Sequence, residues 1–86
     1  MKQFEDNFND INDLIDSIKR GGEAEFLYKD KQYGITPIPE GMAIYEFYNP
    51  KTEKVYSQAE DLAQHIIGED MLCDIAADIK ILFRSL

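Results

Sequence analysis

One imidazole and one thiol, those of His65 and Cys73, are the side chains of this 86-residue chain best suited to base or nucleophilic catalysis. His65 lies in a predicted helix, and no serine or cysteine stands at a spacing typical of a catalytic pair. The carboxylates of Asp70 and Asp74 flank Cys73 in the sequence and oppose formation of its thiolate. We therefore interpret both residues as structural and predict that the chain is not an enzyme and needs no cofactor.

A metal centre is not expected either, because one cysteine and one histidine cannot build a zinc cluster. Rows of aspartates occur, but calcium and magnesium sites need oxygen ligands that converge in a loop with turn glycines. The glycines lack the spacing of a phosphate-binding loop. The lone cysteine indicates a reducing compartment, and no apolar run is long enough to span a membrane, so we expect a cytoplasmic protein.

The net charge of −8 is concentrated at the two ends of the sequence. Residues 1–18 hold five acidic residues against Lys2, and residues 55–86 hold six against Lys80 and Arg84, so each segment carries −4. Such a field repels nucleic acid and anionic membranes and attracts basic proteins. We therefore expect a basic protein partner, such as a nucleic-acid enzyme, with no direct binding of nucleic acid and no membrane association.

Two rows of aspartates are candidates for that contact. Like charges at positions i and i+4 destabilise a helix by about 0.2–0.5 kcal/mol per pair, so the presence of such rows needs an explanation. The rows either keep the protein in solution or imitate the phosphates of nucleic acid on a basic groove. A third group lies near predicted strand turns, where loops often carry function. The candidate partner-binding residues are Asp6, Asp10 and Asp13 in the first row, Asp70, Asp74 and Asp78 in the second, and Asp30, Glu40 and Glu46 near the turns.

The tyrosines form a second group of interest, because all five fall in the predicted sheet region. About half of the aromatic residues there are expected in the core, and the others must face outward. Tyrosine with an acidic surround is common in protein–protein interfaces. The five are Tyr28, Tyr33, Tyr45, Tyr48 and Tyr56.

An amphipathic helix is predicted over Asp6–Lys19, and Gly21 and Gly22 end it. Its apolar positions recur at steps of four and three residues, and they are Phe4, Phe8, Ile11, Ile15 and Ile18.

The middle of the chain predicts three antiparallel strands over Glu23–Tyr28, Gln32–Pro37 and Met42–Tyr48, separated by turns rich in lysine, aspartate, proline and glycine. The pair Val55–Tyr56 either adds a brief fourth strand or leads out of the sheet.

Two helices are predicted in the C-terminal third. Ser57 and Glu60 have the spacing of a capping box, and Gly68 ends the helix that they open. A longer helix follows from Glu69, with an apolar stripe that reaches Leu86. The expected fold is one α+β domain over residues 1–86, ordered α-β-β-β-α-α, with a three-stranded antiparallel sheet packed against helices.

Three segments of the chain, residues 18–26, residues 33–36 and residues 78–81, resemble a group of short hypothetical proteins from Gram-positive bacteria and their mobile elements. They read IKRGGEAEF, YGIT and DIKI. The expected layout, the acidity and the run INDLI at residues 11–15 resemble a phage anti-CRISPR protein that inhibits the type II CRISPR nuclease as a DNA mimic. That resemblance implies a decoy for the arginines with which such a nuclease reads DNA, and it assigns no site residue.

The leading hypothesis is therefore a non-catalytic acidic inhibitor or decoy that docks on a basic nucleic-acid-binding protein, as a monomer or weak homodimer. One alternative is an immunity protein or antitoxin for a nuclease toxin. Another is a small regulatory or dimerisation domain that uses an apolar C-terminal helix.

Overall fold

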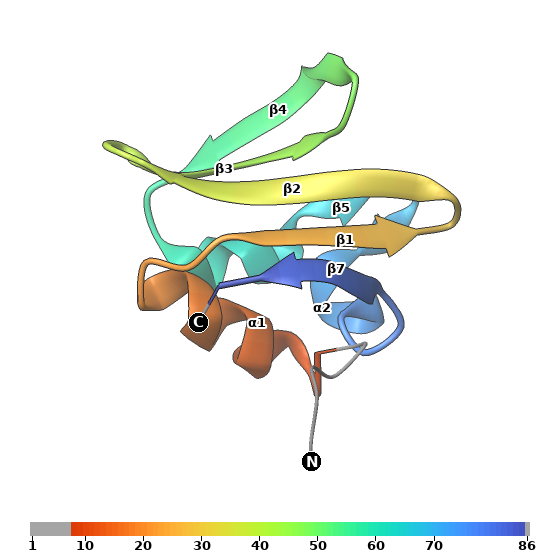
Figure 1. The fold of residues 1–86 in the computed structure, drawn as a ribbon, viewed down its shortest axis with the longest axis horizontal. Coiled ribbons are helices and arrows are strands. Elements are labelled where there is room, and N and C mark those ends of the chain that lie inside the picture. Colours follow the sequence, from red (N-terminus) through yellow and green to blue (C-terminus); the bar gives the residue numbers. More distant parts are fainter. Residues whose placement is uncertain (1–7, 86) are drawn as a thin grey trace.

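A five-stranded antiparallel sheet forms the centre of the fold in the computed structural model, which describes residues 8–85 (Figure 1). Strands account for 46% of these residues and helical segments for 24%, so the predicted three-stranded α-β-β-β-α-α arrangement is wrong. The elements are α1 (Ile11–Lys19), β1 (Ala24–Tyr28), β2 (Lys31–Ile38), β3 (Gly41–Glu46), β4 (Asn49–Tyr56), the 3-10 helix η1 (Ala59–Gln64), β5 (Ile66–Ile67), β6 (Asp70–Met71), α2 (Leu72–Ile75) and β7 (Lys80–Arg84).

Strands β1 to β4 form a meander of consecutive hairpins, and β7 pairs with the other edge of β1, which gives the order β4-β3-β2-β1-β7. Every neighbouring pair is antiparallel. In the two-residue turn between β1 and β2, Lys29 and Asp30 both have positive φ, as the right-handed twist of a tight hairpin favours. The three predicted strands correspond to β1, β2 and β3, and the fourth is longer than the expected pair at 55–56.

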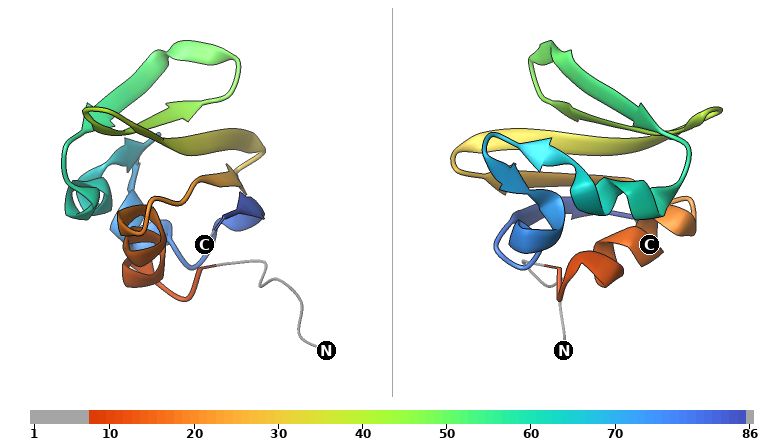
Figure 2. Two further views of the ribbon diagram at one scale, coloured as in Figure 1. Left: turned by 60° about the vertical axis from the view of Figure 1, so that its left-hand side comes forward. Right: turned by 180° about the vertical axis from the view of Figure 1, so that it is seen from behind.

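The helical segments and the small β5–β6 hairpin lie on one face of the sheet, and the β3–β4 hairpin projects away from them (Figure 2). The buried core fills the space between the two layers, where apolar side chains leave water. Its largest fully buried side chains are Phe8, Leu14, Phe26, Ile35, Ile44, Leu62, Leu72 and Ile79. Within residues 8–85, no helix is both long enough and apolar enough to cross a membrane.

Helix α1 begins at Ile11. The helix was predicted to begin at Asp6, and this prediction is wrong because residues 8–10 are not helical. Asp10 has extended backbone and accepts a hydrogen bond of 3.1 Å from the backbone N–H of Asp13. In return, the Asp13 carboxylate accepts one of 3.1 Å from the N–H of Asn9. The first bond satisfies an N–H group at the start of the helix, and the second ties Asn9, which precedes the N-cap, to the first turn. Phe8 lies before the helix but is buried, and Phe4 and Asp6 lie outside the described residues.

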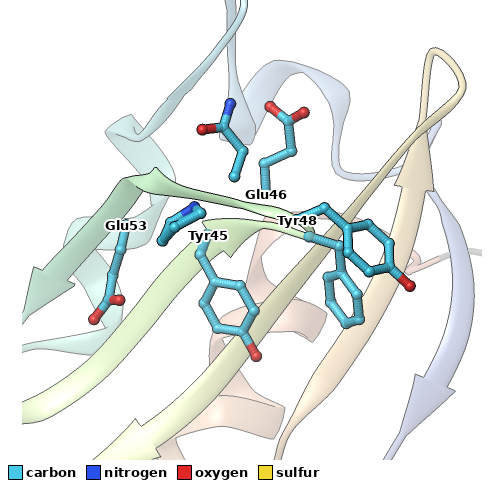
Figure 3. Close-up of a pocket in the computed structure, with 7 residues that line it drawn as sticks. Tyr45, Glu46, Tyr48 and Glu53 are labelled. Atoms are coloured by element: carbon cyan, nitrogen blue, oxygen red, sulfur yellow. The ribbon is translucent and has the colours of Figure 1, made fainter.

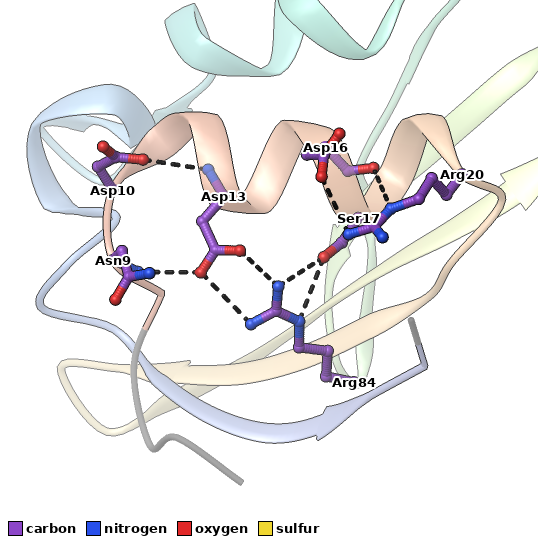
Figure 4. Close-up of polar contacts among 7 residues, drawn as sticks. All are labelled: Asn9, Asp10, Asp13, Asp16, Ser17, Arg20 and Arg84. Atoms are coloured by element: carbon purple, nitrogen blue, oxygen red, sulfur yellow. Dashed lines mark hydrogen bonds and ion pairs between the residues drawn. The ribbon is translucent and has the colours of Figure 1, made fainter.

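Asp13 also joins α1 to the last strand through Arg84 (Figure 4). The two side chains form an ion pair of 2.5 Å, and only about a fifth of the surface of each side chain is exposed to solvent. Arg84 also donates to the hydroxyl of Ser17 at 2.8 Å, and its guanidinium lies 4.8 Å from the centre of the Phe8 ring. The carboxylate of Asp13 therefore serves an internal contact between two ends of the chain.

The C-terminal third does not form the two predicted helices. The capping box expected at Ser57 and Glu60 is absent from the described structure, because Gln58 occupies the N-cap position of η1 without a side-chain capping bond. Glu60 instead accepts a hydrogen bond of 2.7 Å from Lys19. Gly68 forms a turn at φ +66° between β5 and β6.

The long helix predicted from Glu69 is reduced to the single turn of α2, and β7 takes its place. The run IKILF at residues 79–83 is rich in β-branched and aromatic residues, and β1 offers an edge with which it can pair. The Asp70, Asp74 and Asp78 row would also have been repulsive in a helix. These residues lie in β6, in α2 and in the turn that follows, so they form no helical ridge.

Candidate functional site

The tip of the β3–β4 hairpin carries the most exposed large apolar side chain among the described residues. Tyr48 is 97% exposed, whereas Val55, Ile66, Leu82 and Phe83, the other exposed large apolar residues, retain about half of their surface. Its backbone has a φ of +65°, in the left-handed region that favours glycine or asparagine.

The left-handed backbone at Tyr48 costs on the order of 1–2 kcal/mol for a residue with a bulky side chain. A buried tyrosine would offset that cost by removing apolar surface from water, but this ring is almost wholly in solvent. Backbone strain of this kind gathers at binding sites, where a contact outside the domain supplies the compensation. The hairpin tip is therefore the candidate site.

Three aromatic rings lie together at the tip (Figure 3). The rings of Tyr45 and Phe47 are nearly parallel, with centres 5.8 Å apart and an angle of 27° between their planes. The ring of Tyr48 meets that of Phe47 edge-on, at 6.1 Å and 74°. A hydrogen bond of 3.0 Å joins the hydroxyls of Tyr45 and Thr36 across to β2. We call the three rings of Tyr45, Phe47 and Tyr48 the aromatic tip.

Gly34 on β2 makes room for two of these rings. A Cβ atom at this position would lie 2.8 Å from Cζ of Tyr45 and 2.9 Å from Cε1 of Phe47. Such distances are shorter than van der Waals contact, so both rings depend on the missing side chain. This explains a glycine in the interior of a strand, where it otherwise weakens the strand.

The start of β4 is irregular and is held by one hydroxyl. The register shifts between Ile44 and Glu46, so that residues 50–53 bow out of the ladder. The hydroxyl of Thr52 accepts a hydrogen bond from the N–H of Glu46 and donates one to the carbonyl of Asn49, both at 2.8 Å. Bulges of this kind redirect side chains beside functional sites.

The bowed segment and the aromatic tip enclose a shallow hollow of about 250 Å³, too small for most cofactors. Glu53 and Tyr45 extend to the same side of the hairpin in Figure 3, and Glu46 extends to the other side. Glu46 lies 3.9 Å from Lys31, whereas Glu53 is exposed and forms no ion pair with any described residue. The lining comprises Tyr45, Glu46, Phe47, Tyr48, Asn49, Pro50 and Glu53.

The candidate acidic residues from the sequence are not brought together by the fold. Three of them contact side chains of other elements or turns: Asp13 pairs with Arg84, Glu46 with Lys31, and Asp70 with Tyr28 and Lys29, while Asp10 caps α1. The others are exposed and lie on separate elements or turns, and they are Asp10, Asp30, Glu40, Asp74 and Asp78. Asp6 lies outside the described residues.

Asp70 fastens the β5–β6 hairpin to the β1–β2 turn. Its carboxylate accepts hydrogen bonds of 2.8 Å from Tyr28 and 3.2 Å from Lys29. The hydrogen bond from Tyr28 lowers the pKa of Asp70, and the bond and charge of Lys29 lower it further. The same bond to Asp70 raises the pKa of the Tyr28 hydroxyl. A second hollow of about 370 Å³ adjoins this contact, but the polar groups named here already satisfy one another.

His65 and Cys73 lie apart from the hairpin tip. The Nδ1 atom of His65 lies 2.9 Å from the hydroxyl of Tyr56, and the imidazole is buried. Burial lowers the pKa of His65, and the charge of Lys54 adds to the effect. The thiol of Cys73 is half-buried and donates weakly to Asp74 at 3.8 Å. Within residues 8–85, no three histidine, cysteine, aspartate or glutamate side chains are grouped as metal ligands.

We expect the substitution Gly34→Ala to displace the aromatic tip. The new methyl group would overlap the rings of Tyr45 and Phe47, and overpacking of this kind costs about 1–3 kcal/mol. Urea unfolding should show that loss, and the ring proton resonances of Tyr45 and Phe47 should shift. Unchanged ring resonances in the folded variant would contradict the packing described here.

Part of this site could be predicted from the sequence. The clustering of tyrosines predicted outward-facing rings, and Tyr48 does face outward, while Tyr45 is half-buried, Tyr33 lies in the core and Tyr28 and Tyr56 pack against it. Thr52 and Glu53 were missed because their roles depend on the bulge in β4. In comparisons with protein-family models, curated proteins and solved structures, nothing matches this chain.

Proposed function

We propose that this chain is a non-catalytic binding protein that docks on a basic protein through the aromatic tip of its β3–β4 hairpin. The observation that carries the proposal is Tyr48, a ring left 97% in solvent on a strained backbone. Inside the isolated domain this arrangement only costs stability, whereas in an interface the ring would bury a large apolar area.

The charge of the chain indicates the class of partner. A net charge of −8 complements a basic surface and accelerates association with it. Proteins that bind nucleic acid carry strongly basic surfaces. We therefore propose a nucleic-acid-binding protein as the partner, with the chain acting as an inhibitor that occupies its basic surface. The type II CRISPR nuclease belongs to this class and is the first purified target to test.

The proposal is tested with the substitution Tyr48→Asn, because asparagine tolerates left-handed backbone and removes the ring. Relief of strain should raise the free energy of unfolding by about 0.5–1 kcal/mol. Loss of an anchoring ring should weaken binding by about 30-fold, which corresponds to about 2 kcal/mol. Urea unfolding measures the first effect, and calorimetry with the purified partner measures the second.

Two controls accompany this variant. Tyr48→Phe keeps the ring and should retain most of the affinity, and Phe83→Asn removes an exposed ring from the distant strand β7 and should leave binding unchanged. Where no partner is known, the same chains serve as affinity baits, and the protein retained in a Tyr48-dependent way is purified for calorimetry. A partner that binds the Tyr48→Asn chain as tightly as the wild type contradicts the proposal.

Inhibition is tested separately from binding. If the chain occupies the basic surface, it should displace labelled nucleic acid from the partner, and raising the salt from about 0.1 M to about 1 M should weaken the complex as the screening length falls from about 10 Å to about 3 Å. Binding that leaves the nucleic acid in place would refute the inhibitor role while the docking role stands.

A further inference from the structure

We propose that the hollow at the aromatic tip receives an arginine side chain of the protein partner. This inference rests on the proposed function, because it names the group on the partner that the site would bind. The ring geometry, the charge of the lining and the size of the hollow each bear on that choice.

The arrangement of the rings suits a flat cation. Tyr45 and Phe47 form a stacked pair of nearly parallel rings, and Tyr48 stands at a steep angle to Phe47. A guanidinium is planar and stacks face-on against aromatic rings. An ammonium gains most from rings that surround it, and a stacked pair with one further ring at a steep angle surrounds it poorly.

The charge around the hollow favours a cation. Two of its seven lining residues, Glu46 and Glu53, are acidic, and no basic side chain belongs to the lining among the described residues. Lys51 occupies the bowed segment but does not line the hollow. Because Glu46 already faces Lys31, the exposed carboxylate of Glu53 is the one available to pair with an incoming guanidinium.

The hollow also has the size of a side chain and the shape of an open site. Its volume of about 250 Å³ lies below the range of pockets that hold drug-sized ligands. Asn49, beside Tyr48, adds an amide that can accept a hydrogen bond from the remaining guanidinium N–H groups. An arginine projecting from a protein surface fits these limits, and a nucleotide or a larger cofactor does not.

The experiment uses three hexapeptides, of arginine, of lysine and of citrulline, titrated into the full 86-residue chain and followed by NMR. Hexa-arginine should shift the ring resonances of Tyr45, Phe47 and Tyr48 and should bind at least fivefold more tightly than hexa-lysine, which carries the same charge. Hexa-citrulline keeps the shape of the side chain without its charge, and it should not bind. In the Glu53→Gln variant, or in the Tyr48→Asn variant, the chemical-shift changes that hexa-arginine causes at the aromatic tip should be at least fivefold smaller.

Two other results of the titration would overturn the inference. Equal affinities for hexa-arginine and hexa-lysine would mean that charge alone is recognised, and shifts confined to the acidic residues of α1, η1 and α2 would mean that binding occurs elsewhere. If the tip fails to bind hexa-arginine while a partner still depends on Tyr48, the arginine inference fails and the proposed function survives. If the peptide binds at the tip but no partner depends on Tyr48, the proposed function fails.

Discussion

The substitution Gly41→Ala is expected to remove about 4 kcal/mol or more from the free energy of unfolding. Gly41 opens β3 with a φ of +142°, a conformation that residues with a side chain rarely adopt. A Cβ atom there would overlap the carbonyl oxygen of Tyr56 and lie 2.7 Å from Cα of Ser57. Both are backbone atoms, held in place by the pairing of Met42 with Tyr56. The methyl group can be accommodated only if β4 separates from β3.

A loss of that size is a large part of the total stability of a small domain, which is about 5–15 kcal/mol. Urea unfolding followed by circular dichroism should therefore show a chain that is partly unfolded at room temperature. Gly68→Ala is the matched control, because Gly68 also has a positive φ but a Cβ there would meet nothing within 4 Å. The control should lose about 1 kcal/mol. Equal losses in the two variants would mean that the contact with Tyr56 is not as close as described.

The parts of the fold that were predicted correctly depend on residues close together in the sequence. The α1 helix ends where Gly21 and Gly22 were expected to end it, and the first two turns between strands lie where they were expected. The third strand, however, ends at Glu46 and not at Tyr48. The C-terminal strand was missed because Ile75, Ile79 and Leu82 also fit a helical repeat. Its true structure depends on pairing with β1, more than fifty residues earlier, and no local pattern indicates such a contact.

The candidate site shows the same division. The sequence shows acidic residues but not their partners, so Asp13 looked available although Arg84, which binds it, is 71 residues away. The tyrosine cluster could be seen in the sequence. The strain at Tyr48 could not, because it depends on the backbone conformation of one turn. The hypothesis of a basic partner does not depend on the missing helical row, because the net charge remains.

The contact between Asp13 and Arg84 should be the most stabilising ion pair among the described residues. Removing the carboxylate by Asp13→Asn leaves a guanidinium with only a fifth of its exposure and without its counter-charge, which should cost about 2–3 kcal/mol. The control is Asp16→Asn on the same helix. The pair of Asp16 with Arg20 is mostly exposed, and its loss should cost about 0.5 kcal/mol or less. Urea unfolding near neutral pH measures both.

The pH dependence of this difference follows from the pKa of Asp13. Burial alone would raise it, but the hydrogen bonds from Arg84 and from the N–H of Asn9, with the nearby charges of Arg84 and Arg20, bring it below its ordinary value of 3.8. The folded state therefore binds a proton there less readily than the unfolded state. The stability that the ionised carboxylate contributes should be fully present well above pH 3.8 and should shrink as the pH falls through the lower, folded-state pKa. The gap between the wild type and Asp13→Asn should thus narrow in acid, while a gap that is constant from neutral pH to below pH 3 would show that packing, not charge, makes Asp13 important.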